Sequence, residues 1–309
     1  MLHFMFSKLQ MLLRCDYTLI LLFYFAQTVE SCSIGVAFGQ SSFTDLDFAD
    51  DVSLLAELLE LLVPILETTA SEAASLGFEI NWHKKKVQAL GCREDMPLTI
   101  KVQGQDVMVV KEFVYLGSLI HSSTGKTCDI SRRSAIARAA MQSLENQIWR
   151  SRLAISTKLK LYNTCILPIF LYGSDCWAIS KTDARKIDAL DQWCLRMLLD
   201  IKWYQFVRND DVRRLAKQPK LTAIIQSRRL TLFGHIMRMD DNADSKRILL
   251  ASLPADWRRQ PGRSHITWLS TVQQDLKQHH LITLPEATDP LAQNRPLWRM
   301  MSTYGATQS

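Results

Sequence analysis

The early part of the chain alternates apolar and polar positions in a way that predicts short β-strands. "SIGVAFG" (residues 33–39), "FTDLDF" (43–48) and "DVSLLAE" (51–57) each show the short apolar run or the period of two that strands have. "ADD" (49–51) stands where the second and third strands meet. The pattern therefore predicts a β-hairpin with this triplet at its tip.

A helix and a second pair of strands are predicted after this hairpin. "ELLELLVPILETTASEAASLG" has helical periodicity, with Pro64 either kinking the helix or starting its second part and Gly77 ending it. "FEINWHKKKVQAL" predicts a strand and a turn that carries Lys84 and two further lysines. "VMVVKEFVYLGSLI" predicts another hairpin or strand pair with a glycine at its bend.

From residue 125 onward the pattern is mainly helical. In "CDISRRSAIARAAMQSLENQIWRS" the apolar positions of one face recur at helical spacing: Ala137, Met141, Leu144 and Ile148. Another face is expected to present three arginines: Arg132, Arg133 and Arg138. The fold class predicted is α+β, with a small incomplete sheet and one main helix over residues 34–120 and mostly helices over residues 125–300.

Residues 17–26, "YTLILLFYFA", are the most apolar run of the chain, and two interpretations of them stay open. The run is about half of the ~20 residues that a membrane-spanning helix needs, so no membrane span is expected. Lys8 and Arg14 before it and "VESCS" after it fit a secretory signal peptide, although Asp16 stands on the wrong side of the run for that. The other interpretation is a buried strand or helix of a globular domain.

Charge is distributed unevenly along the 309 residues, which carry a net charge of +6. Residues 41–80 hold nine Asp or Glu and no Lys or Arg, whereas 35 basic residues face 20 acidic ones from residue 81 onward. An acidic island beside a long basic body is expected of a protein whose partner is a polyanion such as nucleic acid. A solvated surface of mixed charge is the simpler alternative.

Cysteine spacing argues against structural zinc and against a disulfide framework. The seven cysteines show no CxxC and no finger-like Cys/His spacing: Cys15, Cys32, Cys92, Cys128, Cys165, Cys176 and Cys194. An odd, unpatterned set in a chain of this length is typical of reduced thiols. We therefore expect an intracellular protein of the nucleus or cytoplasm, with secretion as the alternative if residues 1–33 act as a signal sequence.

Carboxylates within the predicted hairpin need an explanation, because desolvating a charge in a buried strand costs several kcal/mol unless a partner compensates. Side chains alternate along a strand, so Asp50 shares a face with Phe48 while Asp45 and Asp47 point to the other face. Asp50 and Asp51 stand together at the turn, where a hard divalent cation such as Mg²⁺ would find oxygen ligands. Solvated turn residues are the alternative for such an Asp-Asp pair.

Several motifs resemble, in order, the late palm motifs of reverse transcriptases from non-LTR (LINE-type) retrotransposons. "FADD" is similar to the catalytic hairpin, "LGFEINWHKKKV" to the following palm motif with its Asn and Lys, and "FVYLGSLI" to the primer-grip motif. Downstream, "YNTCILPIFLYGSDCWAISK", "LRMLLDIKW", "RRLTLFGHIMRMD" and "WRRQPGRSHITWLSTVQQDL" resemble the thumb and C-terminal region of the same polyproteins. The resemblance covers about residues 34–305.

The resemblance implies a division of the chain into four regions. They are a divergent hydrophobic N-terminal segment, a partial palm, a thumb-like helical region and a C-terminal helical region: residues 1–33, 34–122, 123–205 and 206–309. It also implies an RNA template and a DNA primer as the ancestral partners and Mg²⁺ as the ancestral cofactor.

The resemblance implies roles for individual residues as well. Asp50 matches the metal-ligating carboxylate and Asp51 its supporting partner, in a family that uses two-metal in-line displacement. Lys84 matches the lysine that approaches the incoming triphosphate or the leaving group. The primer-grip turn, where a tight bend lets the backbone approach the primer terminus, is matched by three residues: Tyr115, Leu116 and Gly117.

The basic helix predicted in "CDISRRSAIARAAMQSLENQIWRS" (128–151) would, in a thumb, follow the phosphate backbone of a template and primer duplex through Arg132, Arg133 and Arg138. A soluble basic surface is the alternative. Seven tryptophans in this half could stack bases but are expected to be core anchors: Trp149, Trp177, Trp193, Trp203, Trp257, Trp268 and Trp298.

Parts of the family pattern have no match in the chain. The fingers, the earlier palm strand with its own Asp and the upstream endonuclease do not fit into the forty or so residues before "FADD". Asp45 and Asp47 do not replace the missing carboxylate, because strand alternation turns them away from Asp50. We therefore expect a truncated reverse transcriptase that does not polymerise alone. The alternatives are a non-catalytic RNA- or DNA-binding remnant and a secreted or membrane-associated protein.

Overall fold

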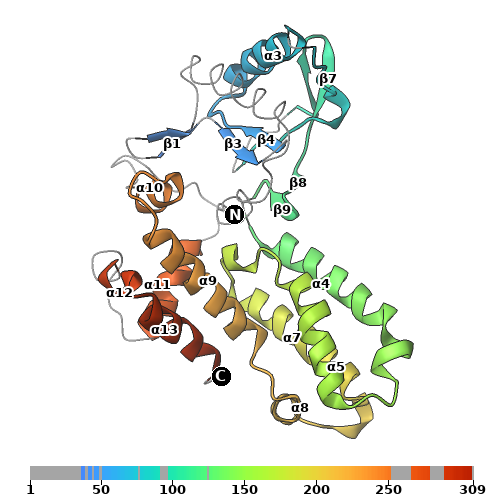
Figure 1. The fold of residues 1–309 in the computed structure, drawn as a ribbon. Helices are drawn as coiled ribbons and strands as arrows, with labels where there is room; N and C mark the ends of the chain where they lie inside the picture. Colours follow the sequence, from blue (N-terminus) through green and yellow to red (C-terminus); the bar gives the residue numbers. More distant parts are fainter. Residues whose placement is uncertain are drawn as a thin grey trace. The chain divides into compact units, whose positions relative to one another are not determined.

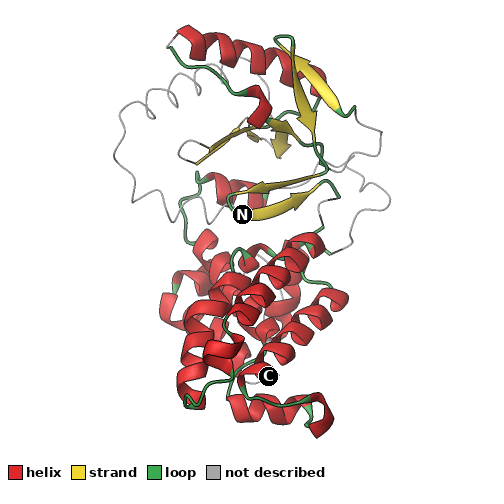
Figure 2. Cartoon of the chain, turned by 90° about the vertical axis from the view of Figure 1, so that its right-hand side faces the viewer, coloured by secondary structure: helices red, strands yellow, loops and turns green. Residues whose placement is uncertain are grey.

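A computed structural model describes most of the chain beyond residue 35. The described residues are 36–38, 41–43, 45–48, 51–75, 77–90, 97–123, 125–251, 266–278 and 289–307. They belong to two compact units, one from residues 1–113 and 240–263 and one from residues 114–239 and 264–309. The chain is mixed α and β and mostly helical (Figure 1, Figure 2).

Residues 17–26, for which the sequence leaves a signal peptide open, lie outside the described residues. Among the helices that are described, none combines the length and the apolar composition needed to cross a lipid bilayer.

The first unit begins with two short antiparallel hairpins. Their strands are β1 (Val36–Phe38), β2 (Ser41–Phe43), β3 (Asp45–Phe48) and β4 (Asp51–Leu54). β1 pairs with β2, and β3 pairs with β4 with Phe48 opposite Asp51. The hairpin predicted around "ADD" is thus confirmed in its strands. "FTDLDF", predicted as one strand, is instead divided between β2 and β3.

One long helix, α3 (Leu59–Ser75), follows these hairpins. Pro64 lies inside the helix, so no second helix begins there. The predicted end at Gly77 is confirmed, since this residue has a left-handed φ of 81°. Its N–H donates to the Ala74 carbonyl and the Phe78 N–H to the Ala73 carbonyl, which is the hydrogen-bond pattern of a glycine-terminated helix.

A three-stranded sheet with the order β5-β7-β6 packs against α3. Its strands are β5 (Lys86–Val87), β6 (Thr99–Val102) and β7 (Gln105–Val109). Val102 and Val107 are buried in this sheet, and Leu59 and Val63 of α3 pack against them. The helix thereby supplies the second layer that a small sheet needs to bury its apolar face.

Two features of this sheet differ from the sequence prediction. The strand predicted at "FEIN" is not formed, and a 3₁₀ turn, Trp82–Lys84, precedes β5 instead. The hairpin of β6 and β7 was not predicted. Its turn residues Gln103 and Gly104 both have positive φ, 49° and 77°, as a two-residue hairpin turn of the primed type requires.

A short helix from later in the chain, α10 (Asp244–Leu250), belongs to the first unit. The Arg247 guanidinium lies 5.6 Å from the centroid of the Phe43 ring. Phe43 is buried, so this contact ties α10 to the early hairpins.

The second unit starts within β8 and is otherwise built almost entirely from helices. Its main elements are β8 (Glu112–Tyr115), β9 (Ser118–His121), α4 (Thr127–Ser143), α5 (Ile155–Leu161), α6 (Leu167–Phe170), α7 (Lys181–Leu198), α8 (Asn209–Ala216), α9 (Leu221–Met237), α11 (Trp268–Gln278), α12 (Asp289–Gln293) and α13 (Arg295–Thr307). Two π-helical turns, Glu145–Trp149 and Tyr162–Ile166, adjoin α4 and α5. The helices predicted after residue 125 are confirmed.

Tryptophans anchor the core of this unit, as predicted for Trp149, Trp177 and Trp298. All three are almost completely buried. The indole N–H of Trp149 donates to the Met141 carbonyl at 2.8 Å and that of Trp298 to the Leu230 carbonyl at 2.9 Å, which satisfies the buried donors. The prediction is wrong for Trp203, which is 84% exposed. Trp257 lies outside the described residues.

A single hydrophobic core extends across the predicted region boundary at residue 205. Val212, Leu221 and Ile225 lie in the same buried cluster as Ile130 and Trp149. The described helices on both sides of residue 205 therefore share one core, because α7 packs on α4, α8 and α9. The assignment of these regions to a palm and a thumb stays a prediction.

Candidate functional site

The tip of the β3–β4 hairpin carries the predicted metal ligands. The register Phe48↔Asp51 leaves two residues, 49 and 50, to connect the strands. Asp50 lies outside the described residues, and of Asp51 only the backbone is described. In the described part of the chain no three His, Cys, Asp or Glu side chains gather as metal ligands. Magnesium at this tip stays a prediction.

Lys84, the residue matched to the triphosphate-approaching lysine, ends the 3₁₀ turn Trp82–Lys84 and is exposed. The Asn81 side-chain oxygen accepts a hydrogen bond from the Lys84 backbone N–H at 3.3 Å. The Asn and the Lys of this motif are thus joined locally, with the asparagine fixing the turn that presents the lysine.

The turn between β8 and β9 holds the residues predicted as a primer grip. Leu116 and Gly117 have φ values of 46° and 79°, the pair of left-handed conformations of a tight primed hairpin turn. Tyr115, just before the turn, is buried. A Cβ on residue 117 would lie 3.0 Å from Cε1 of Tyr172, so the glycine is also required by a close approach.

Side chains from α4 and from the segment after α6 bind the carbonyls of this turn. The Tyr172 hydroxyl donates to the Leu116 carbonyl at 2.8 Å. Arg132 donates to the Gly117 carbonyl at 3.1 Å, and Arg133 donates to the same oxygen. We call Arg132, Arg133 and Tyr172 the turn clamp. Both turn carbonyls are therefore held by the second unit itself.

Asp129 fixes the neighbouring strand to the same helix. One oxygen of its carboxylate accepts from the Leu119 N–H at 2.9 Å and the other from the Trp177 indole N–H at 2.9 Å. Asp129 and Trp177 are both buried, so these hydrogen bonds are shielded from water. The hairpin of β8 and β9 is thus attached to α4 at its turn and along β9.

Arg133 does not lie on the face that the sequence predicted. Its side chain is 8% exposed and lies on the buried stripe of α4 with Ile130, Ala137 and Met141. The reason is helical geometry, since residue 133 stands four positions before Ala137. Burial lowers the pKa of the Arg133 guanidinium, while Asp129 acts in the opposite direction. The Tyr172 ring, 4.3 Å away, adds a cation–π contact.

Arg138 is exposed, as predicted for a residue that contacts phosphates. Its guanidinium lies 4.9 Å from the centroid of the Trp193 ring on α7, which holds the side chain against the helix surface. Of the three predicted arginines, Arg138 is thus exposed on the surface, whereas Arg132 and Arg133 belong to the turn clamp.

The segment of the second unit from residue 114 to 239 is strongly basic outside its core. Residues 114–239 contain 21 Lys and Arg and nine Asp and Glu. Four of these carboxylates are buried (Asp129, Asp175, Asp183 and Asp191), and so are three of the cations (Arg133, Lys158 and Arg229). Eighteen cationic side chains therefore face five acidic ones outside the core. The ratio of cationic to acidic side chains is therefore larger outside the core than in residues 114–239 as a whole.

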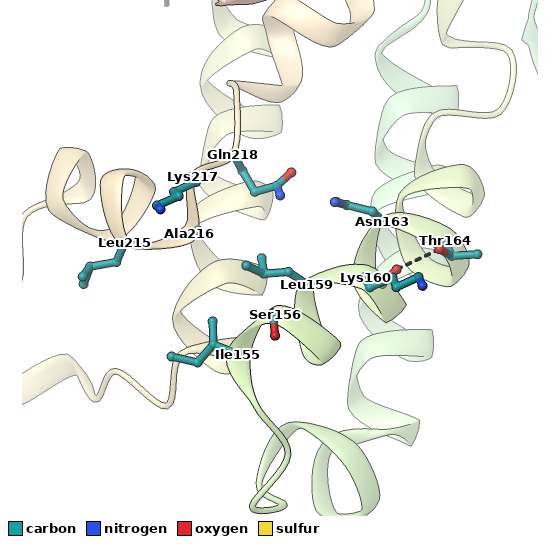
Figure 3. Close-up of a pocket in the computed structure, with 10 residues that line it drawn as sticks. All are labelled: Ile155, Ser156, Leu159, Lys160, Asn163, Thr164, Leu215, Ala216, Lys217 and Gln218. Carbon is teal, nitrogen blue, oxygen red and sulfur yellow. Dashed lines mark hydrogen bonds between the residues drawn. The ribbon is translucent and has the colours of Figure 1, made fainter.

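A groove of about 530 Å³ opens between α5, the π-helical turn after it, and the end of α8. Figure 3 shows Asn163 and Gln218 pointing toward one another across it, with Leu159 below them in this view. Lys160 and Lys217 also line it. The lining combines apolar side chains with amides and cations.

Sequence reasoning missed several of these residues. No periodic pattern marks Tyr172 or Asp129, because the residues to which they are hydrogen-bonded lie 56 and 10 positions away along the chain. A signal did exist for the exposed aromatic residues between α7 and α8. In "KWYQFVR" three aromatics fall within four residues between two basic ones, outside any amphipathic period.

Comparison with known proteins identifies a transposon-derived relative. No protein-family model matches the chain. The chain is similar to the "Putative uncharacterized transposon-derived protein" of Caenorhabditis elegans, with 23% identity over 275 residues. The aligned region covers 86% of this chain and 97% of that protein. The similarity therefore extends through both described units and points to an origin in a transposon.

Proposed function

We propose that this chain is a transposon-derived relative of non-LTR reverse transcriptases whose helical second unit binds nucleic acid through the phosphate backbone. The proposal takes up the ordered motifs of the sequence and the transposon-derived relative. It assigns the ancestral partners, an RNA template and a DNA primer, to the surface of this unit.

The observation that carries the proposal is the charge of the second unit. Outside the core, residues 114–239 carry eighteen cationic side chains against five acidic ones, so this part of the unit has an excess of positive charge. The buried acidic residues are taken up by internal contacts, such as the Arg213–Asp191 pair at 2.8 Å and the Asp129 hydrogen bonds. A phosphate backbone is the partner whose charge complements such a surface without requiring a shaped cavity.

The turn clamp supports a more specific role for the β8–β9 hairpin. Because Arg132 and Arg133 both donate to the Gly117 carbonyl, they position the turn and use part of their hydrogen-bonding capacity on it. We propose that the turn approaches a primer end while Arg138 and other exposed cations contact phosphates. Arg132 would contribute a further phosphate contact with its remaining donors.

We further propose that Asp50 and Asp51 are the remnant of a magnesium site. Mg²⁺ bound there would supply charge stabilisation for phosphoryl transfer, the role of metals in two-metal enzymes. The sequence offers these two carboxylates and no match to the earlier palm carboxylate. The 309 residues alone are therefore expected not to extend a primer on an RNA template with Mg²⁺ or Mn²⁺, and Asp50→Ala should leave that result unchanged. Extension that Asp50→Ala abolishes would contradict this part of the proposal.

The binding proposal is tested by salt titration of an RNA–DNA hybrid. The affinity of the purified chain, measured by fluorescence anisotropy, should fall by orders of magnitude between about 50 and 200 mM KCl and should not depend on sequence. Replacing Lys160, Lys186 and Lys217 by Gln should lower the magnitude of the log–log slope by about one for each phosphate that the variant no longer neutralises.

A charge-matched control separates a local effect from net charge. Lys86, Lys101 and Lys111 are exposed on the first unit, and their replacement by Gln removes the same charge. The control should leave the affinity nearly unchanged. Equal losses in both triple variants, or binding insensitive to salt, would refute the assignment to the second unit. Arg138→Gln is the cleaner test of α4, since changing Arg132 and Arg133 also dismantles the turn clamp.

A further inference from the structure

The segment between α7 and α8 presents three aromatic side chains to solvent. Trp203 is 84% exposed, Phe206 is 86% exposed and Tyr204 is 58% exposed. Trp149 and Trp177 of the same unit are buried. Large aromatic rings stabilise a folded protein most when they are buried. Three exposed rings within four residues therefore indicate a surface that another molecule covers.

The backbone beneath these rings is held in place by α7. Arg196 of that helix donates to the Val207 carbonyl at 2.6 Å and to the Asn209 side chain at 2.9 Å. Ile201 and Val207, on either side of the aromatic residues, pack against the core. The exposure of the rings is therefore a property of an anchored loop.

The local conformation of the loop also favours exposed rings. The Lys202 N–H donates to the Gln205 side-chain oxygen at 2.8 Å, which closes the 3₁₀ turn Trp203–Gln205. Phe206 then adopts a left-handed φ of 49°, a conformation that costs free energy for a bulky residue. Trp203 and Tyr204 meet edge to face, with ring centroids 5.9 Å apart. The backbone of the loop is therefore strained at Phe206, and its three rings are exposed in this conformation.

A basic residue stands at each end of this loop, Lys202 and Arg208. Lys202 pairs with Asp200 at 2.5 Å, which neutralises the loop's own acidic residue. In the described part of the chain neither Arg152 nor Arg208 forms an ion pair, and both are exposed. Arg152 lies in the turn between the π-helical turn Glu145–Trp149 and α5, and both of these elements pack on α7, the helix that leads into the loop. Exposed rings beside unpaired cations match a ligand with flat bases and phosphates.

We propose that Trp203 and Phe206 stack bases of a single-stranded nucleic acid while Arg208 and Arg152 contact its phosphates. This inference rests on the proposed function, because it names single-stranded nucleic acid as the form that this end of the second unit binds. Aromatic stacking with basic flanks is how proteins hold single strands without reading their sequence. Exposed aromatic side chains beside cations also occur at membrane interfaces, so a lipid surface is the other outcome of the test. The ordered motifs of the sequence and the transposon-derived relative, on which the proposed function rests, favour nucleic acid.

The test compares a short single-stranded RNA with the RNA–DNA hybrid, using the full chain. Trp203→Ala should weaken single-strand binding by about 5- to 150-fold, the usual effect of removing one stacking ring, and leave hybrid binding unchanged. Trp203→Phe keeps a ring and should retain most of the affinity. Single-strand binding should quench tryptophan emission in the wild-type chain and less so in Trp203→Ala. Since Trp203 is 84% exposed, its replacement should leave the melting temperature unchanged.

Met300→Ala serves as the matched control, because it truncates another exposed apolar side chain, 62% exposed, on α13. It should leave single-strand affinity within about twofold. Wild-type single-strand affinity in the Trp203→Ala, Phe206→Ala double variant would overturn the inference and leave the proposed function standing. Failure of the wild-type chain to bind any nucleic acid would overturn the proposed function itself. If the double variant lost binding to anionic lipid vesicles while its RNA binding stayed unchanged, the loop would be assigned to a membrane instead.

Discussion

Gly234 in α9 provides a sharp test of how the second unit is packed. A Cβ at this position would overlap the indole of Trp298 on α13, coming 2.5 Å from Cδ1 and closer still to the ring nitrogen. An exposed helical Gly→Ala change normally stabilises by about 1 kcal/mol. Trp298 is 3% exposed, and losing the packing of a buried tryptophan costs about 3–5 kcal/mol. We therefore expect Gly234→Ala to destabilise the unit by about 2–4 kcal/mol.

Chemical denaturation followed by tryptophan fluorescence measures this effect. Displacing Trp298 also breaks its hydrogen bond to the Leu230 carbonyl, so the native emission should shift as well. Gly125→Ala is the control, because its Cβ would meet only the Ser123 hydroxyl at 3.6 Å and should change stability by less than about 0.5 kcal/mol.

The stability change caused by Gly234→Ala should reverse its sign when Trp298 is also replaced. In a Trp298→Ala chain the obstruction is gone, and Gly234→Ala should then stabilise by about 1 kcal/mol through helix propensity alone. Destabilisation of equal size in both backgrounds would show that the indole does not set the requirement for glycine.

Two further predictions concern other parts of the second unit. Tyr172→Phe removes the hydroxyl that donates to the Leu116 carbonyl, so we expect a loss of about 0.5–1.5 kcal/mol and faster hydrogen exchange at the β8–β9 turn; unchanged exchange there would contradict the turn clamp. Burial raises the pKa of Cys194 to about 12, above its ordinary value near 9, so the thiol stays protonated in the folded state while the unfolded thiol ionises. Stability should therefore be fully present below pH 9 and fall as pH rises from 9 toward 12, with a shallower fall in Cys194→Ala; identical pH profiles would refute the linkage.

Local patterns of the sequence predicted local structure well. The period of two marked β3 and β4, and the helical period with Gly77 marked the extent and end of α3. These features depend on neighbouring residues, so a single sequence contains them. The β6–β7 hairpin was missed because its turn, Gln103 and Gly104, lacks the usual Asn or Asp before the glycine.

Other features depend on contacts between distant segments. The spacing of Arg133 to Ala137 already placed the arginine on the buried stripe, but only the turn clamp explains why a cation is tolerated there. The exposure of Trp203 depends on how α7 anchors the loop, which no periodic pattern encodes. The tip at Asp50 rests on motif resemblance alone, since that residue lies outside the described part of the chain.

Each of the two units is made of two separate segments of the chain, which limits how the protein can be divided into fragments. The first unit takes residues 1–113, the second takes 114–239, and the chain then contributes 240–263 to the first before completing the second. A fragment starting at residue 114 would thus carry α10 as a nested insertion without the Phe43 ring that Arg247 contacts. Proteolytic trimming would likewise have to cut on both sides of α10 to release the second unit. Isolating that unit calls for replacing residues 240–263 by a short linker, in addition to removing the N-terminal residues.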